Sequence, residues 1–289
     1  MSNPSGISVI VPFYNESLAI EHVLRGLVTY LDARGTVYEI IAVDDSSTDD
    51  SFLKAKSVSG VTVLHHSQNR GYGAAIKTGV RHAQYDWVVW YDGDGQHKPE
   101  HVSIVSEIQG DEHMVVGARI HQKNPLIRRP GKWILSLIAN YLVDTKIPDL
   151  NSGMRMVRKD TFRKFEHLYP DGFSISTTIT LSLLKSKIPV RYVPIEIEHR
   201  VGKSSVSPKD AFRMLSLIFR IVTLFSPLRV FMPLSAVTLT LALISLGSDI
   251  ILRNLTDTTV VLFLSTLMMF SFAITLDHVA AIRRDIHNL

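Results

Sequence analysis

The sequence contains no cysteine, so it can form neither a disulfide framework nor a thiolate metal site. It also lacks a strong charge imbalance. The formal net charge is +4, and no basic arm with interleaved aromatic residues occurs, which argues against a nucleic-acid-binding protein. The N-terminal Met1–Gly6 has no basic segment followed by a long apolar stretch, as a signal peptide would. We therefore expect the N-terminal domain to stay in the compartment where it is made.

Charge is also missing from two long runs near the C-terminus, Phe231–Ser248 and Thr258–Leu276. Each apolar stretch is roughly 18–22 residues long, enough to cross a hydrocarbon core of about 30 Å. The short connection Arg253–Asp257 predicts a transmembrane hairpin with spans at about 231–252 and 258–278. The alternative is a pair of buried core helices.

The distribution of arginine around these runs predicts how the hairpin is oriented. Cytoplasmic loops of membrane proteins carry an excess of Lys and Arg, so both ends of the hairpin and the large N-terminal domain should lie in the cytoplasm. Nearby arginines on the outer sides of the two runs are Arg213, Arg220, Arg229, Arg283 and Arg284, whereas the connection holds only Arg253.

The first hundred residues alternate between short β-prone runs and segments with helical spacing. The strands are expected at Ile7–Val11, ending at Pro12, and at Tyr38–Val43, Val61–Leu64 and Trp87–Tyr91. The first helix is expected from the apolar spacing that begins at Leu18. Such alternation is typical of βαβ units, so we predict an α/β domain with a mostly parallel sheet.

Polar residues and glycines follow all four predicted strands. Ligands of such sheets bind beyond the carboxyl ends of the strands, so these residues predict a binding site on one edge. Helix capping is the alternative explanation. The residues are Asn15 and Glu16, then Asp44 and Asp45, then Asn69, Gly71 and Gly73, and finally Asp92 and Asp94.

The segment Asp92-Gly-Asp-Gly-Gln96 follows an apolar strand and places two carboxylates one residue apart. Carboxylate oxygens suit Mg²⁺ or Mn²⁺, which take few protein carboxylates and fill their other positions with water and phosphate oxygens. The segment therefore predicts a metal–diphosphate site. A solvated Asp-Gly turn is the alternative.

These motifs together resemble those of a known family. Val11–Glu16, Val43–Asp49, Asn69–Gly73 and Asp92–Glu100 are similar to the successive motifs of family-2 glycosyltransferases with the GT-A fold. The later motifs, with the hairpin, resemble polyprenyl-phosphate glycosyltransferases, the group of dolichyl-phosphate mannose synthase and bactoprenol glucosyltransferase. Those later motifs are Asp149–Arg155 and Arg200–Ser205.

The resemblance covers about residues 7–225 and implies an architecture and an activity. A Rossmann-like GT-A catalytic domain would occupy 1–206, followed by an interfacial amphipathic helix at 207–230, the hairpin at 231–280 and a cytoplasmic tail at 281–289. The implied reaction is an inverting, metal-dependent transfer of one sugar from GDP-mannose or UDP-glucose, or another UDP-hexose, to dolichyl or undecaprenyl phosphate. The product would be a lipid-linked sugar donor, and self-association is left open.

Three other functions fit the sequence less well. A processive polysaccharide synthase would carry a Gln-x-x-Arg-Trp motif and more spans, and the motif does not occur. A sugar-nucleotidyltransferase would have a glycine-rich basic loop after the first strand, where this sequence has Pro12–Asn15. A non-catalytic membrane scaffold would not need the intact pair Asp92 and Asp94.

The resemblance also assigns donor-side roles. Metal binding is expected from Asp92, Asp94 and Gln96, and Asp45 is expected to support the site. Many relatives carry larger residues at the positions of Gly93 and Gly95, which predicts a more mobile loop here. The expected nucleotide-sugar contacts are Pro12, Tyr14, Glu16, Asp44, Asn69, Gly71, Asp92, Arg200 and Lys203, with Asn69, Gly71 and Gly73 allowing close approach.

On the acceptor side, the resemblance predicts a cationic cradle for the lipid phosphate. The residues expected there are Arg119, a basic residue of the cluster Arg128–Lys132, with Arg129 and Lys132 as the candidates, and Ser136. A basic patch that attracts anionic lipid is the alternative. The predicted catalytic residues are Asp94, Asp149 and Arg200. Asp149 is expected to orient the sugar or the acceptor, and a helix cap is its alternative role. Arg200 is expected to lie in a lid loop over the donor, and an ordinary surface loop is the alternative there. The histidines are interpreted as loop or helix-start residues.

Overall fold

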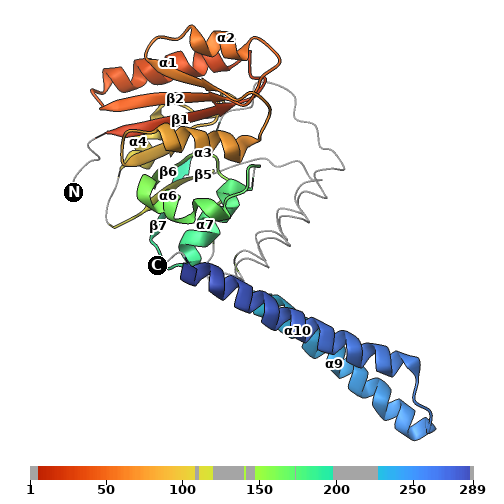
Figure 1. Cartoon of the computed structure of the whole chain (residues 1–289). Coiled ribbons are helices and arrows are strands. Elements are labelled where there is room, and N and C mark those ends of the chain that lie inside the picture. The colour runs from red at the N-terminus through yellow and green to blue at the C-terminus, as the bar shows by residue number, and fades with distance from the viewer. Residues whose placement is uncertain are drawn as a thin grey trace. The chain divides into compact units, whose positions relative to one another are not determined.

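A computed structural model describes residues 6–107, 111–119, 140, 147–172, 174–197 and 227–286 (Figure 1). These residues fall into two compact units, a sheet-containing unit and a C-terminal helical unit. The strands are β1 (Ile7–Phe13), β2 (Tyr38–Asp44), β3 (Val61–His65), β4 (Trp87–Trp90), β5 (Met114–Arg119), β6 (Arg155–Arg158) and β7 (Val190–Ile195). The helices are α1 (Ile20–Ala33), α2 (Ser51–Lys56), α3 (Tyr72–His82), α4 (Glu100–Ser106), α6 (Lys159–Phe165), η2 (Glu166–Leu168), α7 (Ile175–Lys185), α9 (Pro227–Leu252) and α10 (Asp257–Ile286).

The strands form one sheet in the order β3-β2-β1-β4-β6-β5-β7. Strand β6 is antiparallel to β4 and β5, and the other pairs are parallel. The predicted mostly parallel sheet is therefore confirmed. Because β4 and β5 both oppose β6, their carboxyl ends meet the carboxyl ends of β1 and β2 at the same edge.

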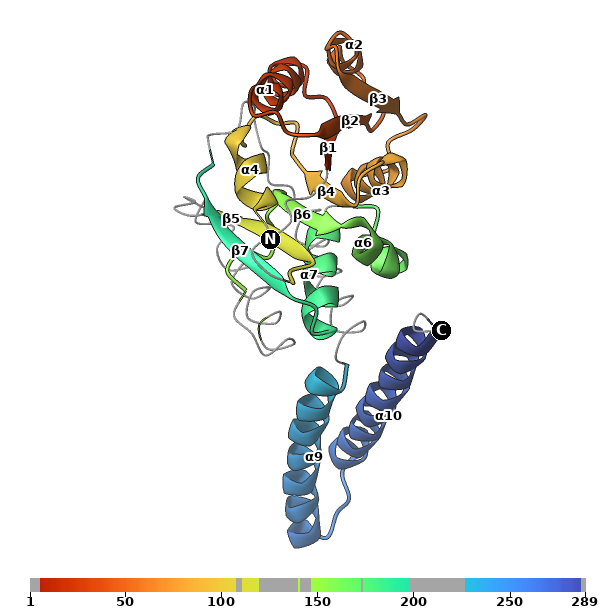
Figure 2. The same cartoon turned by 90° about the vertical axis from the view of Figure 1, so that its left-hand side faces the viewer.

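Helices cover both faces of the sheet, so its strands are apolar on both sides. Helices α1, α2 and α4 pack on one face, and α3, α6 and α7 pack on the other (Figure 2). Helix α1 buries Ile20, Val23, Leu24, Leu27 and Leu31, and each such side chain contributes about 1.5–3 kcal/mol to stability.

Several predicted boundaries in this unit were wrong: β2 and β3 each end one residue later than predicted, β4 ends one residue earlier, and the start of α1 and the end of β1 also differ. Leu18 lies in the turn before α1 and is 78% exposed, so it does not belong to the apolar face of the helix. Strand β1 does not end at Pro12 but continues to Phe13. Pairing with β4 ends at Ile10, and beyond it β1 is paired with β2, where the Asp45 N–H donates to the Phe13 carbonyl at 3.0 Å. Because β1 has lost one partner strand by Pro12, the N–H that proline lacks is not needed for pairing there.

The C-terminal unit is a hairpin of α9 and α10, each long and apolar enough to cross a membrane, with mean hydropathies of 2.0 and 2.1. The predicted helical hairpin is confirmed, and its helices are longer than the predicted spans. Helix α9 begins at Pro227 rather than 231, and α10 runs from Asp257 to Ile286, because helical structure continues into the charged flanks. Residues 207–226 of the predicted interfacial helix lie outside the described residues.

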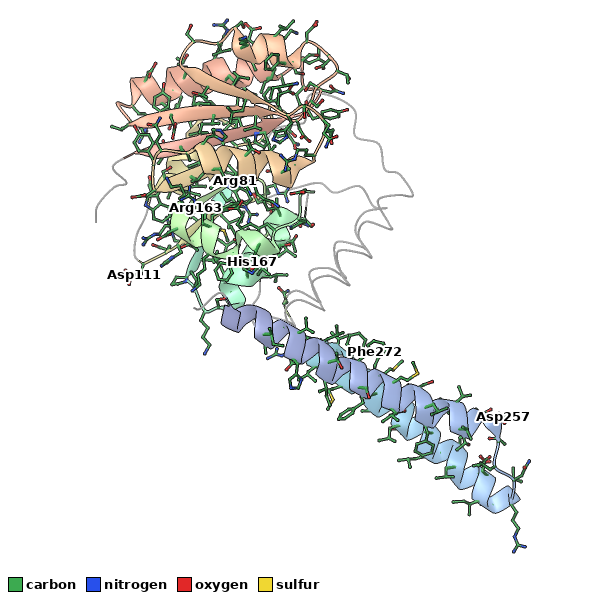
Figure 3. All side chains as sticks on the ribbon, in the orientation of Figure 1. Arg81, Asp111, Arg163, His167, Asp257 and Phe272 are labelled. Atoms are coloured by element: carbon green, nitrogen blue, oxygen red, sulfur yellow. The ribbon has the colours of Figure 1, made fainter. Side chains whose placement is uncertain are left out.

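Small and polar side chains line the seam between α9 and α10, spaced seven residues apart. The Thr266 hydroxyl donates to Thr238 at 2.9 Å, and Ser245 bonds to Thr259 at 2.5 Å. Large apolar side chains point outward; Phe272, for example, is 57% exposed (Figure 3). Such an arrangement is typical of helices that pack within a bilayer. The buried seam residues include Ser235, Ala242 and Asp249 on α9 and Thr259, Ala273 and Ala280 on α10.

Candidate active site

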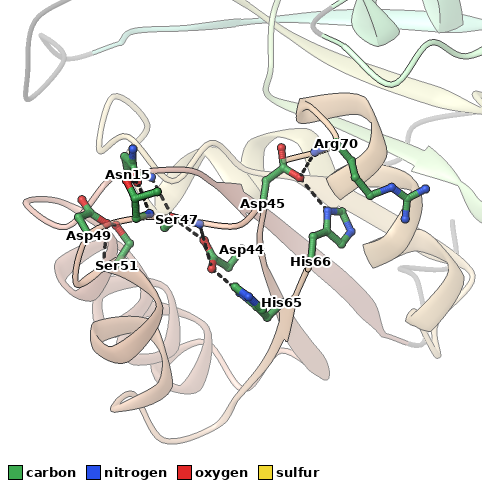
Figure 4. Close-up of polar contacts among 10 residues, drawn as sticks. Asn15, Asp44, Asp45, Ser47, Asp49, Ser51, His65, His66 and Arg70 are labelled. Atoms are coloured by element: carbon green, nitrogen blue, oxygen red, sulfur yellow. Dashed lines mark hydrogen bonds and ion pairs between the residues drawn. The ribbon is translucent and has the colours of Figure 1, made fainter. Parts of the chain in front are cut away.

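The loops after β1 and β2 are bonded to each other at the carboxyl edge of the sheet (Figure 4). Asn15 adopts a left-handed conformation with φ of 54°; its N–H donates to the Ser47 hydroxyl at 2.9 Å, and its side-chain oxygen accepts from the Thr48 N–H at 2.8 Å. Asp44 is fully buried and accepts from the Ser47 N–H at 3.1 Å and bonds to His65 Nδ1 at 2.7 Å. The carboxylate of Asp44 therefore organises this loop.

Asp45 supports the next loop, as expected. Its carboxylate accepts the N–H groups of Arg70 at 2.9 Å and Gly71 at 2.7 Å, and it bonds to His66 Nδ1 at 2.7 Å. His66 in turn bonds to the Thr78 hydroxyl on α3 through Nε2 at 2.9 Å. Asp45 thus fixes the start of α3 at the edge of the sheet where the nucleotide is predicted to bind.

Packing within the protein explains the glycines of this loop, and their contact with a nucleotide stays a prediction. A Cβ at Gly73 would lie 2.2 Å from the Pro170 carbonyl oxygen, and one at Gly71 would lie 2.6 Å from the Asp171 carbonyl oxygen. Gly71 also has φ of +100°, which favours glycine. The close approach that they permit is that of the protein's own segment 170–172, so packing explains them without a nucleotide.

Asp92 follows β4 and is held from three sides. The Tyr72 hydroxyl donates to Oδ1 at 2.8 Å, and His97 Nε2 lies 3.7 Å from Oδ2. A Cβ at Gly153 would lie 2.1 Å from Oδ2, so the main chain of that residue abuts the carboxylate. Burial alone would raise the pKa of Asp92, but His97, the Tyr72 hydroxyl and the charge of Arg119 outweigh it and lower that pKa. The carboxylate is therefore ionised at neutral pH.

Asp94 lies two residues farther along the same turn and accepts the Gln96 N–H at 3.1 Å. Gly95 has φ of +74°, which favours glycine, and a Cβ at Gly93 would make a tight contact of 3.1 Å with that of Phe13. Within the described part of the chain, no group of three or more His, Asp or Glu side chains is arranged to hold a metal. Two carboxylates and an amide oxygen fit a hard cation that takes its other ligands from a diphosphate.

Arg119 and Asp149, predicted separately, form an ion pair. Arg119 ends β5, and its Nε and Nη2 donate to the two Asp149 oxygens at 2.6 and 2.9 Å. The main-chain N–H groups of Arg119 and Asn151 also donate to the Asp149 carboxylate, at 3.2 and 3.1 Å. Burial alone would raise the pKa of Asp149, but the bonds and charge of Arg119 outweigh it and lower that pKa. Asp149 therefore orients Arg119, whose charge also reaches Asp92.

The other predicted site residues divide into two sets. At the edge, Tyr14 and Asn69 are exposed, Glu16 and Gln96 are half-buried, and Pro12 is buried in β1. The remaining residues lie outside the described ones and their assignments stay predictions: Arg129, Lys132, Ser136, Arg200 and Lys203.

Comparison with known proteins shows to which family the chain belongs. Residues 8–165 match the family described as Glycosyl transferase family 2, and residues 226–282 match the GtrB C-terminal hairpin. The chain belongs to glycosyl transferase family 2. The predicted resemblance is therefore confirmed, and the protein is a glycosyltransferase.

Individual relatives agree with this family. An uncharacterized protein of Methanocaldococcus jannaschii is 30% identical over 67% of this chain and 82% of its own length. An undecaprenyl-phosphate 4-deoxy-4-formamido-L-arabinose transferase of Edwardsiella ictaluri is 25% identical over 77% of this chain and 69% of its own. The crystal structure of Mycobacterium tuberculosis glucosyl-3-phosphoglycerate synthase with Mn²⁺, UDP and phosphoglyceric acid superposes with a TM-score of 0.61 at 18% identity, over 75% of this chain and 78% of that one. That likeness confirms the GT-A fold.

Several residues of the glycosyltransferase edge were not foreseen as site residues. Tyr72 stands inside the Asn69–Gly73 motif and His97 directly follows Gln96, so motif membership was the available signal. His65 and His66 were interpreted as loop residues, but each bonds to one of the two adjacent aspartates, Asp44 and Asp45. No local pattern marks that pairing, because it joins β3 to β2 across the sheet.

Proposed function

We propose that this glycosyltransferase transfers one sugar from a nucleotide sugar, GDP-mannose or a UDP-hexose, to a polyprenyl phosphate. The observation that carries the proposal is the meeting of Asp92 with the Arg119–Asp149 pair at one sheet edge. An acidic metal site and an anchored cation stand beside each other there, as needed for a donor diphosphate and an anionic acceptor.

On the donor side, Asp92, Asp94 and Gln96 would hold Mg²⁺ or Mn²⁺. The ion would stabilise the negative charge that the nucleoside diphosphate gains as it leaves. Crystal structures of the mycobacterial synthase contain UDP with Mn²⁺ or with Mg²⁺, which supports divalent metal use. The hydrogen bond from the Tyr72 hydroxyl to Oδ1 would hold the Asp92 carboxylate in place for the metal.

On the acceptor side, the name of the Edwardsiella relative supports a polyprenyl phosphate acceptor. Such a phosphate is already ionised, so it can displace the leaving group in one inverting step without a strong general base. Arg119 would bind it, together with Arg129, Lys132 and Ser136. Because Asp149 accepts two hydrogen bonds from the Arg119 guanidinium, we assign it to orienting that cation.

The hairpin supports a site at the membrane surface, where a lipid phosphate is available. The arginine distribution supports a cytoplasmic catalytic domain, since Arg229 lies in the first turn of α9 and Arg283 and Arg284 lie near the end of α10.

A donor screen tests the proposal. The full-length protein in detergent is incubated with a short polyprenyl phosphate, Mn²⁺ or Mg²⁺, and each of a panel of radiolabelled sugar nucleotides. We expect a lipid-linked sugar from at least one GDP- or UDP-sugar. The absence of product with every donor would refute the proposal.

The metal assignment is tested with Asp94→Asn in the same assay. Loss of one charge at the metal should lower the rate of transfer by about 10²-fold or more. The matched control is Asp111→Asn, an exposed residue before β5 labelled in Figure 3, which should leave the rate unchanged. Unchanged transfer by Asp94→Asn would exclude the metal role.

A further inference from the structure

Arg155, at the start of β6, is a buried cation that has no role in the proposed reaction as described above. Its side chain is 0% exposed, and within the described residues no carboxylate forms an ion pair with it. Register places it in a row across the sheet, between Trp90 of β4 and Val116 of β5. Its guanidinium carbon lies 5.1 Å from the centre of the Trp90 ring. Arg155 therefore sits inside the apolar core beneath α7.

Burial disfavours the charged guanidinium of Arg155, and for this reason its pKa is lowered. An apolar side chain of similar size would avoid this desolvation and is often tolerated at such positions. A role beyond packing is therefore required to explain why an arginine occupies this place.

The hydrogen bonds of Arg155 indicate that role. Nη1 donates to the Ser176 carbonyl at 3.0 Å and to the Thr180 hydroxyl at 3.1 Å, both on α7. Nη2 donates to the Ser152 carbonyl, in the loop 149–153 that precedes β6. The planar fork of one guanidinium thus joins two segments of main chain, which a lysine ammonium cannot do with the same geometry.

A second bond ties the same two segments together. The Thr177 hydroxyl, also on α7, donates to the side-chain oxygen of Asn151 at 2.7 Å. The loop 149–153 is therefore fastened to α7 at Asn151 and at Ser152.

This loop positions both halves of the site. At one end it carries Asp149, which holds Arg119. At the other end Gly153 lies directly against the Asp92 carboxylate. A displacement of the loop would move the cation and the metal-binding carboxylate together.

We propose that Arg155 is a positioning residue for sugar transfer, which ties the loop 149–153 to α7 and thereby holds Asp92 and Asp149 in place. The inference rests on the proposed function. It predicts that removing the fork weakens metal binding and slows transfer in a protein that still folds.

The test compares Arg155→Lys and Arg155→Met with Arg158→Lys in the full-length protein. Arg158 lies on the same strand but is half-exposed and pairs with Asp160, so its lysine variant should behave as wild type. For the Arg155 variants we expect about 10-fold weaker Mn²⁺ binding by electron paramagnetic resonance, with UDP or GDP present. We also expect a kcat lower by about 10- to 100-fold with little change in donor KM, and faster amide exchange in 149–153.

Wild-type Mn²⁺ affinity, kcat and exchange in folded Arg155→Lys and Arg155→Met would overturn the proposal. If neither variant folds, Thr177→Val decides, because it removes only the second tie; wild-type Mn²⁺ affinity and exchange in that variant would equally overturn it. Failure of the proposed function can be told apart from failure of this inference. The first would appear as a wild-type protein that transfers no sugar. The second is judged from Mn²⁺ binding and amide exchange, which are compared between variants and do not depend on sugar transfer.

Discussion

At Gly153 the main chain passes so close to Asp92 that a methyl group does not fit, and this contact joins two motifs far apart in the chain. In Gly153→Ala the new Cβ would lie 2.1 Å from Asp92 Oδ2, so the carboxylate must move. A displacement of about 1 Å at a catalytic group can lower a rate by about 10²-fold, and we expect a loss of transfer of that size. Steady-state assay of the variant measures it.

The control for this prediction is Gly172→Ala. Among the described residues, no heavy atom lies within 4 Å of a Cβ added at Gly172, and its φ is not positive, so the same substitution should leave transfer unchanged. Equal activity of the Gly153 and Gly172 variants would show that the contact with Asp92 does not matter for catalysis.

The ion pair of Asp149 with Arg119 predicts a pH dependence of stability. The pKa of Asp149 is lower in the folded protein than its ordinary value, so the ionised carboxylate stabilises the fold. This contribution is complete above the unfolded pKa of about 3.9 and is lost as the pH falls through the folded pKa. The side chains of Asp149 and Arg119 are only 12% and 17% exposed, so solvent screens the pair weakly.

We expect Asp149→Asn to lower the free energy of unfolding by about 1–3 kcal/mol at neutral pH. Thermal unfolding in detergent, followed from about pH 7 to about pH 3, should show the gap to wild type narrowing below about pH 4. Asp111→Asn serves as the control with no gap. A gap of constant size at every pH would contradict the assignment.

At the scale of the elements, the hairpin depends on polar contacts at its closed end. Asp249 of α9 accepts the Thr256 N–H at 2.9 Å and the Thr259 hydroxyl at 2.5 Å. Thr259→Val keeps the shape and removes one donor, so a buried carboxylate oxygen loses a partner. We expect the hairpin to lose about 0.5–2 kcal/mol of stability, measured by thermal unfolding in detergent.

Thr240→Val is the matched change on the outer face of α9. Its hydroxyl is exposed and donates only within its own helix, to the Ala236 carbonyl at 2.9 Å. We expect no loss of stability there. A similar effect of both substitutions would mean that the seam contacts add nothing beyond helix formation.

At the scale of the whole molecule, the absence of cysteine makes membrane topology directly testable. Asn254→Cys places a thiol in the connection between α9 and α10, and Ser186→Cys places one on the exposed end of α7. The arginine distribution predicts that a membrane-impermeant maleimide labels the first variant in intact cells and the second only after permeabilisation. The reverse pattern would place the catalytic domain outside.

Much of this organisation could be predicted from local pattern. The strands up to Trp90 and the acids that follow them were predicted because a buried parallel strand is a continuous apolar run with polar residues at its end. Strand β6 was not predicted, because its four residues, Arg155–Arg158, begin and end with arginine. Its partner strands are chosen by tertiary packing, which a short segment does not encode locally.

The sequence by itself determined the alternation of strands and helices, the two charge-free helices and the position of Asp92 and Asp94 at a strand end. Periodicity and charge act over a few residues, so they are visible in the chain. Only the tertiary structure decided three contacts. Gly153 lies against Asp92, Asp149 accepts hydrogen bonds from Arg119, and Arg155 joins the loop 149–153 to α7. Those contacts join distant segments, and they arise because β6 inserts between β4 and β5.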